Sequence, residues 1–421
     1  MRTYGLLMNR RRFITLLGTG MTAGCLNLQP GGGSQTATPV DTAVDRNTPV
    51  STQTESNPST ETPEETDSLD DGASWAFESD APLTRPAGGT DTVFVGSLDQ
   101  RVYAFDATTG TEEWRIGPEN FQSNNYTLSA PVVAGESVYV GTDIDLLEIN
   151  RQTGEVRTAM TDNPYASLTR ITEDLIVGPN TDNRISAYNR LDETAVWESQ
   201  IETGYGGSEV PIIGEDIIVF AAVSDYVDDP SAQRDKDSRV FGIDRETGEE
   251  LWNFTPDTFI GRSAGVGYAI HENTVVIAGN EESVFGVDAT SGDLRWEQSV
   301  SRAGSGSYAP QPLRYDGSIF LVTGDAYRLN PNTGDIEWSA SIDAGHMSTP
   351  IPILDDKLWT PADGFFEFSS VKTVSMQGEH VATYTPPSVF EETPAISPTR
   401  MFVSHTDDVL RAYDPSAIIS E

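Results

Sequence analysis

The chain of 421 residues is strongly acidic, with 65 aspartates and glutamates against 26 lysines and arginines and a formal net charge of −39. A field of this sign repels nucleic acids and anionic lipid surfaces, so it excludes a nucleic acid as partner. The sequence has one cysteine, which excludes a disulfide bond within a single molecule.

The same charge indicates a salty environment. At low ionic strength the carboxylates repel one another and weaken the compact state, whereas in molar salt the screening length falls to about 3 Å. The composition is therefore typical of a halophilic protein, and we expect a halophilic archaeon as its source.

Residues 1–24 are predicted to form an export signal. The segment Asn9-Arg-Arg-Arg-Phe-Ile resembles a twin-arginine signal, with Arg10, Arg11 and Phe13 at the motif positions. The apolar stretch that follows is too short to span a membrane. We therefore expect the chain to leave the cytoplasm by the twin-arginine route.

The segment Thr-Ala-Gly-Cys that ends at Cys25 resembles a lipobox, in which small residues precede a cysteine that becomes lipid-modified. Lipidation of Cys25 would anchor the protein to the outer face of the cytoplasmic membrane. The alternative is a plain secretory signal that contains an incidental cysteine.

Residues 25–72 are predicted to be a disordered tether. Threonine, serine, proline, glycine and acidic residues dominate from residue 26 to residue 72, and no aromatic residue occurs there. Such a segment cannot bury enough apolar surface to offset the entropy lost on ordering. Its composition also suits an O-glycosylated stalk.

One sequence motif recurs along the rest of the chain. In its clearest copies Asp244 and Asn330 are followed by Thr-Gly and, eight residues after the first position, by tryptophan. The tryptophans placed in this way are Trp114, Trp197, Trp252, Trp296 and Trp338, while Thr158 and Thr383 stand there in degenerate copies. A period of roughly 40 to 45 residues built from short strands and turns predicts a β-propeller.

Each copy is predicted to be one four-stranded antiparallel sheet, or blade. In the second copy we expect strands at residues 130–133, 137–141, 146–150 and 156–160, from the centre of the ring outward. Such runs are rich in β-branched and aromatic residues and are bounded by glycine, aspartate and asparagine. The tryptophan of the outermost strand is expected to pack on the neighbouring sheet, because no blade can bury both of its faces alone.

The second strands predict a ring of eight blades. They begin at Val93, Val138, Ile176, Ile218, Val275, Ile319, Leu358 and Phe402. The eighth copy ends before an outermost strand, whereas Trp75 stands in an unmatched strand before the first copy. We therefore expect the N-terminal strand to complete the last blade, so that residues 73–421 form a closed ring without exposed sheet edges.

This motif resembles the repeat of the pyrroloquinoline-quinone repeat family. In that repeat a strand such as Val-Tyr-Val-Gly at 138–141 is followed by the Thr-Gly turn and the tryptophan. The resemblance covers about residues 73–417 and implies an eight-bladed propeller. The family includes quinoprotein dehydrogenases, which hold the quinone and Ca²⁺ on one face and oxidise alcohols or sugars. It also includes cofactor-free scaffolds, such as the propeller lipoprotein of the bacterial outer-membrane assembly machinery.

The sequence favours a scaffold. Many of the dehydrogenases carry a vicinal cysteine pair or a Cys-x-x-Cys-His haem site, and this chain has neither. We predict a non-catalytic cell-surface propeller that binds a protein or glycan partner and needs no cofactor. The alternative is an alcohol or sugar dehydrogenase that depends on pyrroloquinoline quinone and Ca²⁺.

Binding is expected on the face that carries the connections between blades, opposite the Thr-Gly turns. Arg262, Arg302 and His346 precede inner strands there and are candidates for a polar site at the mouth of the ring. The competing interpretation of these three residues is that of ordinary polar groups at strand ends. No catalytic residue is assigned.

An insertion in the fourth blade carries five carboxylates, which are Asp225, Asp228, Asp229, Asp235 and Asp237. Oxygen ligands of this kind suit Ca²⁺, although in a chain this acidic a solvated surface loop is the commoner outcome. Asn125 and Asn253 begin Asn-x-Thr sequons and are candidate N-glycosylation sites.

Overall fold

The computed structural model describes residues 72–88, 90–120, 128–142, 145–160, 169–180, 184–191, 194–202, 210–223, 238–255, 267–279, 282–301, 310–344, 351–364, 367–390 and 392–416. The expected signal peptide, Cys25 and the tether lie outside the described residues.

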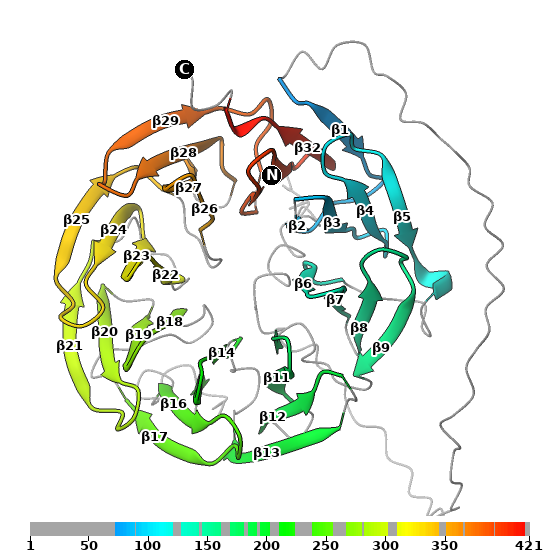
Figure 1. Ribbon diagram of the computed structural model, residues 1–421. Coiled ribbons are helices and arrows are strands. Elements are labelled where there is room, and N and C mark those ends of the chain that lie inside the picture. The colour runs from blue at the N-terminus through cyan, green and yellow to red at the C-terminus, as the bar shows by residue number, and fades with distance from the viewer. Residues whose placement is uncertain are drawn as a thin grey trace, which may run out of the picture.

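The described residues form eight four-stranded antiparallel sheets arranged in a ring, which confirms the predicted eight-bladed β-propeller (Figure 1). From the centre outward, blades 1 to 4 are β2 (Ala87–Gly88), β3 (Thr92–Gly96), β4 (Val102–Asp106) and β5 (Glu112–Ile116); β6 (Val132–Ala134), β7 (Ser137–Gly141), β8 (Leu146–Asn150) and β9 (Val156–Met160); β10 (Arg170–Ile171), β11 (Leu175–Pro179), β12 (Arg184–Asn189) and β13 (Ala195–Glu202); and β14 (Ile212–Ile213), β15 (Ile217–Val223), β16 (Ser238–Asp244) and β17 (Glu250–Phe254).

Blades 5 to 8 follow the same order. They are β18 (Gly267–His271), β19 (Thr274–Ala278), β20 (Ser283–Asp288) and β21 (Leu294–Ser299); β22 (Leu313–Tyr315), β23 (Ser318–Val322), β24 (Asp325–Leu329) and β25 (Ile336–Ser341); β26 (Ile353–Leu354), β27 (Lys357–Ala362), β28 (Ser370–Ser375) and β29 (His380–Tyr384); and β30 (Ala395–Ile396), β31 (Met401–Ser404), β32 (Val409–Tyr413) and β1 (Trp75–Glu78). One short 3-10 helix, η1 (Pro118–Asn120), follows β5.

In the second blade the predicted strand bounds can be compared with the observed ones. Its three outer strands have the expected bounds, whereas the innermost strand is β6 (Val132–Ala134) and not residues 130–133. Pro131 precedes β6, and a proline has no N–H to donate to a ladder. Pairing with β7 therefore begins at Val132, which faces Tyr139.

The ring is closed by the N-terminal strand, as the unmatched Trp75 predicted. Strand β1 pairs with β32, so that Trp75 faces Ala412 and Glu78 faces Val409, and β1 becomes the outermost strand of blade 8 (Figure 1). A further bond at 2.8 Å joins the Ser404 hydroxyl of blade 8 to the Thr84 carbonyl beside blade 1. The first and last described strands thus meet in one sheet.

The apolar core lies between the blades. One cluster joins buried Phe94 and Ala104 of blade 1 to Val138 and Val140 of blade 2, and another joins blades 4 and 5 around Trp252. Strand residues of alternating orientation supply each cluster, so every blade buries one face against each neighbour. This arrangement makes the ring a closed series of blade-to-blade joints.

Six of these joints share one contact, which we call the tryptophan latch. The indole Nε1 of one blade donates to a backbone carbonyl in the turn between the third and fourth strands of the next blade, and the glycine of that turn lies against the indole ring. The bonds run from Trp75 to Ala107 (3.1 Å), Trp114 to Arg151 (3.0 Å), Trp197 to Arg245 (2.8 Å), Trp252 to Ala289 (2.7 Å), Trp296 to Pro331 (2.9 Å) and Trp338 to Met376 (2.8 Å).

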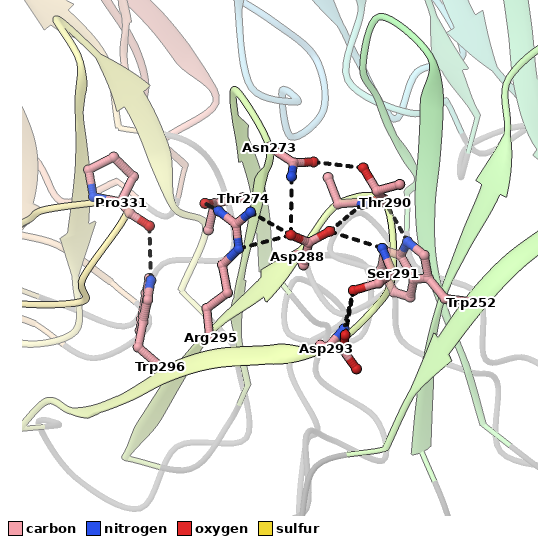
Figure 2. A network of polar contacts seen from close by, with 11 residues as sticks. Trp252, Asn273, Thr274, Asp288, Thr290, Ser291, Asp293, Arg295, Trp296 and Pro331 are labelled. Atoms are coloured by element: carbon pink, nitrogen blue, oxygen red, sulfur yellow. Dashed lines mark hydrogen bonds and ion pairs between the residues drawn. The ribbon is translucent and has the colours of Figure 1, made fainter.

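The turn of blade 5 shows why the repeated motif contains an aspartate and a glycine (Figure 2). Asp288 Oδ1 accepts the backbone N–H groups of Thr290 (2.8 Å) and Ser291 (2.9 Å), which fixes the turn. Gly292 has a φ of 76°, and a Cβ at this position would stand 2.7 Å from Cβ of Trp252. Only glycine tolerates both the left-handed backbone and the close indole.

Arg295 completes this turn. Its guanidinium binds Asp288 Oδ2 at 2.5 Å and the Thr274 hydroxyl at 2.6 Å (Figure 2). The hydrogen bonds from Arg295, followed by those from the backbone, lower the pKa of Asp288 to about 2. The aspartate therefore stays ionised and holds the turn at any pH near neutrality.

Candidate functional site: the loop face and the inner strands

The sheet order defines two ends of the ring. Connections from an outermost strand to the next innermost strand, together with those between second and third strands, emerge at one end, which we call the loop face. The Thr-Gly turns emerge at the other end, the turn face. The expected site residues Arg262, Arg302 and His346, the five aspartates between 225 and 237, and Asn125 lie outside the described residues, so their roles stay predictions.

Of the candidate binding, metal and glycosylation residues, Asn253 alone lies within the described residues. It lies in β17 on the outer rim, and its amide donates to Glu250 Oε1 at 2.7 Å on the exposed surface. An exposed asparagine on an edge strand is accessible to a modifying enzyme, and its glycosylation stays a prediction.

A compact polar cluster lies on the loop face of blade 8. His405 is 4% exposed, and its Nδ1 lies 2.8 Å from the carbonyl oxygen of Ser388. Because a carbonyl can only accept, Nδ1 carries the proton and Nε2 accepts from the Tyr413 hydroxyl at 3.0 Å. Burial, followed by the charge of Arg411, lowers the pKa of His405 to about 4, so the ring is neutral near pH 7.

Ser388, His405 and Asp407 combine the residue types of a hydrolytic triad, but their bonds are arranged differently. Asp407 binds the Ser388 hydroxyl at 3.1 Å and Arg411 at 2.9 Å, whereas the carboxylate of a triad orients the histidine. The Ser388 hydroxyl lies 3.0 Å from His405 Nδ1, but that nitrogen carries the proton donated to the Ser388 carbonyl, and Nε2 accepts from Tyr413. The cluster therefore fixes two loops of blade 8 in place and does not activate a nucleophile.

Carboxylates in the other described loops are held in the same manner. Asp99 accepts the Tyr103 hydroxyl at 2.6 Å and pairs with Arg101 at 3.3 Å, and burial with this hydrogen bond raises the pKa of Tyr103. Asp363 accepts Lys372 Nζ at 2.8 Å, and the same ammonium donates to the Ile342 carbonyl at 2.8 Å. Among the described residues, no three histidine, cysteine, aspartate or glutamate side chains gather in a way that could hold a metal ion.

The inner strands carry arginines, which the sequence interpretation missed. Arg170 is the first residue of β10, the innermost strand of blade 3, and its side chain is exposed. Arg85 lies two residues before β2, the innermost strand of blade 1, and is partly exposed. Solvent therefore reaches the inner strands at these positions.

The turn face has an open depression between blades 1 and 2. Its lining is polar and consists of Asp91, Thr92, Glu113, Glu136, Arg151 and Gln152. Thr92 donates to Glu113 at 3.1 Å, and Arg151 donates to the Gly135 carbonyl at 3.4 Å. The lining contains three carboxylates and one arginine, so the depression has the character of an acidic surface.

A comparison with protein families fits this architecture. The family model PQQ_2, described as outer membrane protein assembly factor BamB, matches residues 65–180 and 236–364, which is more than half of the chain. The chain belongs to this family. The BamB-type propeller of this chain is therefore built on the family's repeat, although a search of curated proteins finds no match.

Solved structures give the same fold. The crystal structure of BamB from Moraxella catarrhalis is 14% identical, covers 81% of this chain and 99% of its own, and has a TM-score of 0.54. The computationally designed protein Ika8 is 14% identical with coverages of 80% and 97% and a TM-score of 0.60. Sqt1 of Saccharomyces cerevisiae is 10% identical with coverages of 82% and 99% and a TM-score of 0.59. Identities this low show a shared fold alone.

Proposed function

We propose that this BamB-type propeller is a non-catalytic scaffold that binds a protein partner through its loop face. Family membership supports the scaffold role, and the described loop-face clusters support it further. The polar side chains of Asp99, Asp363 and His405 are bound by strand residues Tyr103, Lys372 and Tyr413, which gives a preorganised surface. A rigid ring with fixed loops favours recognition over chemistry.

We also propose a cellular location for the propeller. The twin-arginine signal around Arg10 and Arg11 would direct export, and lipidation of Cys25 would place the propeller on the outer face of the cytoplasmic membrane. Residues 25–72 would then separate the ring from the lipid. In the described part of the chain no helix is long and apolar enough to cross a membrane.

Site-directed photo-crosslinking in intact cells tests which face binds. A photoreactive amino acid replaces exposed Asp80 or Pro387 on the loop face, and exposed Thr109 or Asn332 on the turn face as matched controls. We expect one partner band that depends on ultraviolet light at Asp80 or Pro387 and none at the controls. Equal crosslinking on both faces, or crosslinking on the turn face alone, would contradict the proposal.

Three further measurements test the remaining assignments. Reconstitution with pyrroloquinoline quinone and Ca²⁺ should give no dye reduction with alcohols or sugars, and turnover would establish the dehydrogenase in place of the scaffold. Treatment of cells with glycosidases before crosslinking distinguishes a glycan from a protein partner, because a glycan-dependent band would disappear. Membrane fractionation of Cys25→Ser tests the anchor, since unchanged membrane retention would rule it out.

A further inference from the structure

The sequon that begins at Asn253 is a motif that the proposed function does not use. Asn253 lies in β17, the outermost strand of blade 4, which pairs with β16 along one edge. No further strand of the described residues lies along its other edge, which faces the outer rim of the ring (Figure 1). Asn253 and Thr255 are both exposed, and Thr255 follows the end of the strand. The two residues that define the sequon are therefore accessible in the folded ring.

Outermost strands elsewhere in the ring carry charges beside the tryptophan of the repeated motif. A charge on an edge strand opposes pairing with another chain. The two residues that flank the tryptophan are exposed in all five of these strands, and they are Glu113 and Arg115 in β5, Val196 and Glu198 in β13, Leu251 and Asn253 in β17, Arg295 and Glu297 in β21, and Glu337 and Ser339 in β25. Of these five strands, β17 alone has no charge beside its tryptophan.

The edge of β17 also presents an apolar side chain. Leu251 is 48% exposed, and the one carboxylate of the strand, Glu250, lies at its first residue. An unpaired edge with an exposed aliphatic side chain is a surface on which a second copy can pair. Strand β1, whose tryptophan precedes the repeat, has another protection, because it is the shortest of the described outermost strands and ends in exposed Glu78.

We propose that Asn253 carries an N-linked oligosaccharide, and that this sugar covers the edge of β17 in place of the missing charge. The inference goes beyond partner binding and rests on the proposed export of the chain. In the transfer, the amide nitrogen of Asn253 forms a bond to the anomeric carbon of a lipid-linked sugar donor. The bond from that carbon to the phosphate of the donor breaks, the amide gives up one proton, and the lipid phosphate leaves.

The contacts of Asn253 are compatible with this modification. Its amide donates one hydrogen bond, to Glu250 Oε1 at 2.7 Å on the exposed surface. An asparagine amide has two N–H groups, so the sugar can replace one hydrogen while the other stays bonded to Glu250. The carboxylate would then hold the linkage on the outer rim, where β17 has its unpaired edge.

Mass spectrometry of the protein from its native cells tests the modification. Trypsin cleaves after Arg245 and Arg262, so it releases Asn253 in a peptide with a single sequon. We expect this peptide to carry a sugar mass that is lost in Thr255→Ala and kept in Thr255→Ser, because the transferase reads the hydroxyl group. An unmodified peptide from protein that an external protease reaches on intact cells would overturn the proposal.

Sedimentation at two salt concentrations tests the protective role. In molar salt the screening length falls to about 3 Å, so a charge on the edge loses its effect, whereas the volume of a sugar does not depend on salt. Asn253→Gln should therefore sediment as a larger species than wild type at both salt concentrations, and Asn253→Glu should do so only in molar salt. The matched control is Ser339→Gln, which changes the equivalent residue of β25 and should leave sedimentation unchanged. Equal sedimentation of Asn253→Gln and Ser339→Gln would overturn the protective role.

Two outcomes separate the sugar from the function and location proposed above. Unmodified Asn253 in protein that an external protease cannot reach on intact cells would refute export and the sugar together. A modified Asn253 in cells where wild-type protein gives no loop-face crosslink would refute the scaffold and leave the sugar in place.

Discussion

The six latched joints differ sharply from the two joints that lack a tryptophan. Between blades 2 and 3, Thr158 stands in place of tryptophan, and the turn of blade 3 at residues 189–194 contains no glycine. Arg190 of that turn instead donates to the Tyr139 hydroxyl of blade 2 at 3.2 Å and lies 3.9 Å from Glu148, which Arg157 also binds. Tryptophan and glycine are therefore two halves of one contact, and both are absent where the joint is polar.

The joint between blades 7 and 8 lacks the latch for another reason. Blade 8 takes its outermost strand from the N-terminus, so no hairpin turn joins β32 to β1. No turn glycine is therefore present to contact a side chain at position 383, where threonine stands in place of tryptophan. Tyr384 of blade 7 packs edge-on against Tyr413 of blade 8 at 5.1 Å, and Tyr413 binds His405. An aromatic contact thus replaces the latch where the covalent connection is missing.

Removing an indole should have the largest effect. Trp252 is 5% exposed, and Trp252→Ala should lower the free energy of unfolding by about 4 kcal/mol, because a large buried side chain and its bond to Ala289 are lost. Denaturant unfolding at fixed high salt measures this change. Thr158→Ala at the equivalent unlatched position should cost less than about 1 kcal/mol, and similar losses at both positions would remove the distinction between the joints.

Lowering the pH should weaken the joint between blades 7 and 8. The pKa of His405 is about 4 in the folded protein against 6.5 in an unfolded chain, so the unfolded chain takes up the proton first. Stability from this group is complete above pH 6.5, and up to about 3 kcal/mol is lost as the pH falls to 4. Unfolding at several pH values should show a steeper loss for wild type than for His405→Gln, and parallel curves would exclude His405 as the cause.

Adding one methyl group to a latch should have an intermediate effect. Gly292→Ala should destabilise by about 2 kcal/mol, because the left-handed backbone is strained and the new Cβ meets Trp252. Gly317→Ala is the matched control, since Gly317 has a φ of 72° but a Cβ added there would meet no atom within 4 Å, and strain alone should cost about 1 kcal/mol. Equal losses in thermal unfolding would mean that the indole contact contributes nothing.

A substitution in the polar joint between blades 2 and 3 should have the smallest effect on stability and the strongest dependence on salt. Arg190→Gln should cost about 1 kcal/mol at low ionic strength and less in molar salt, because screening weakens the pairing with Glu148. Trp252→Ala should show no such difference between salts. A salt-independent loss for Arg190→Gln would indicate that packing and not charge holds this joint.

The fold was accessible from the sequence because each blade repeats its own turn and strand pattern. Trp75 was informative since an unmatched tryptophan can pair only with the copy that lacks one. The partner of each indole was not predicted, because the glycine it contacts belongs to the next repeat and about 40 residues separate them. The shared absence at Thr158 and in the turn at 189–194 is the signal that could have revealed it.

The candidate site was less accessible. Arg85 and Arg170 carry no motif, and their place at the inner strands depends on how eight blades converge. No sequence pattern indicates that Ser388 and Tyr413 enclose His405. Residues that act through position and not through type need the assembled ring to be recognised.

The pairing of β1 with β32 also sets an order in time. During synthesis β1 emerges long before β32, so β1 stays unpaired until all the blades between them have been made. Seven blades can form from neighbouring segments, but the eighth requires both ends. A chain cut short before β32 would leave β1 as an unpaired edge, which is the kind of surface that aggregates or is degraded, so closure of the ring depends on synthesis of β32.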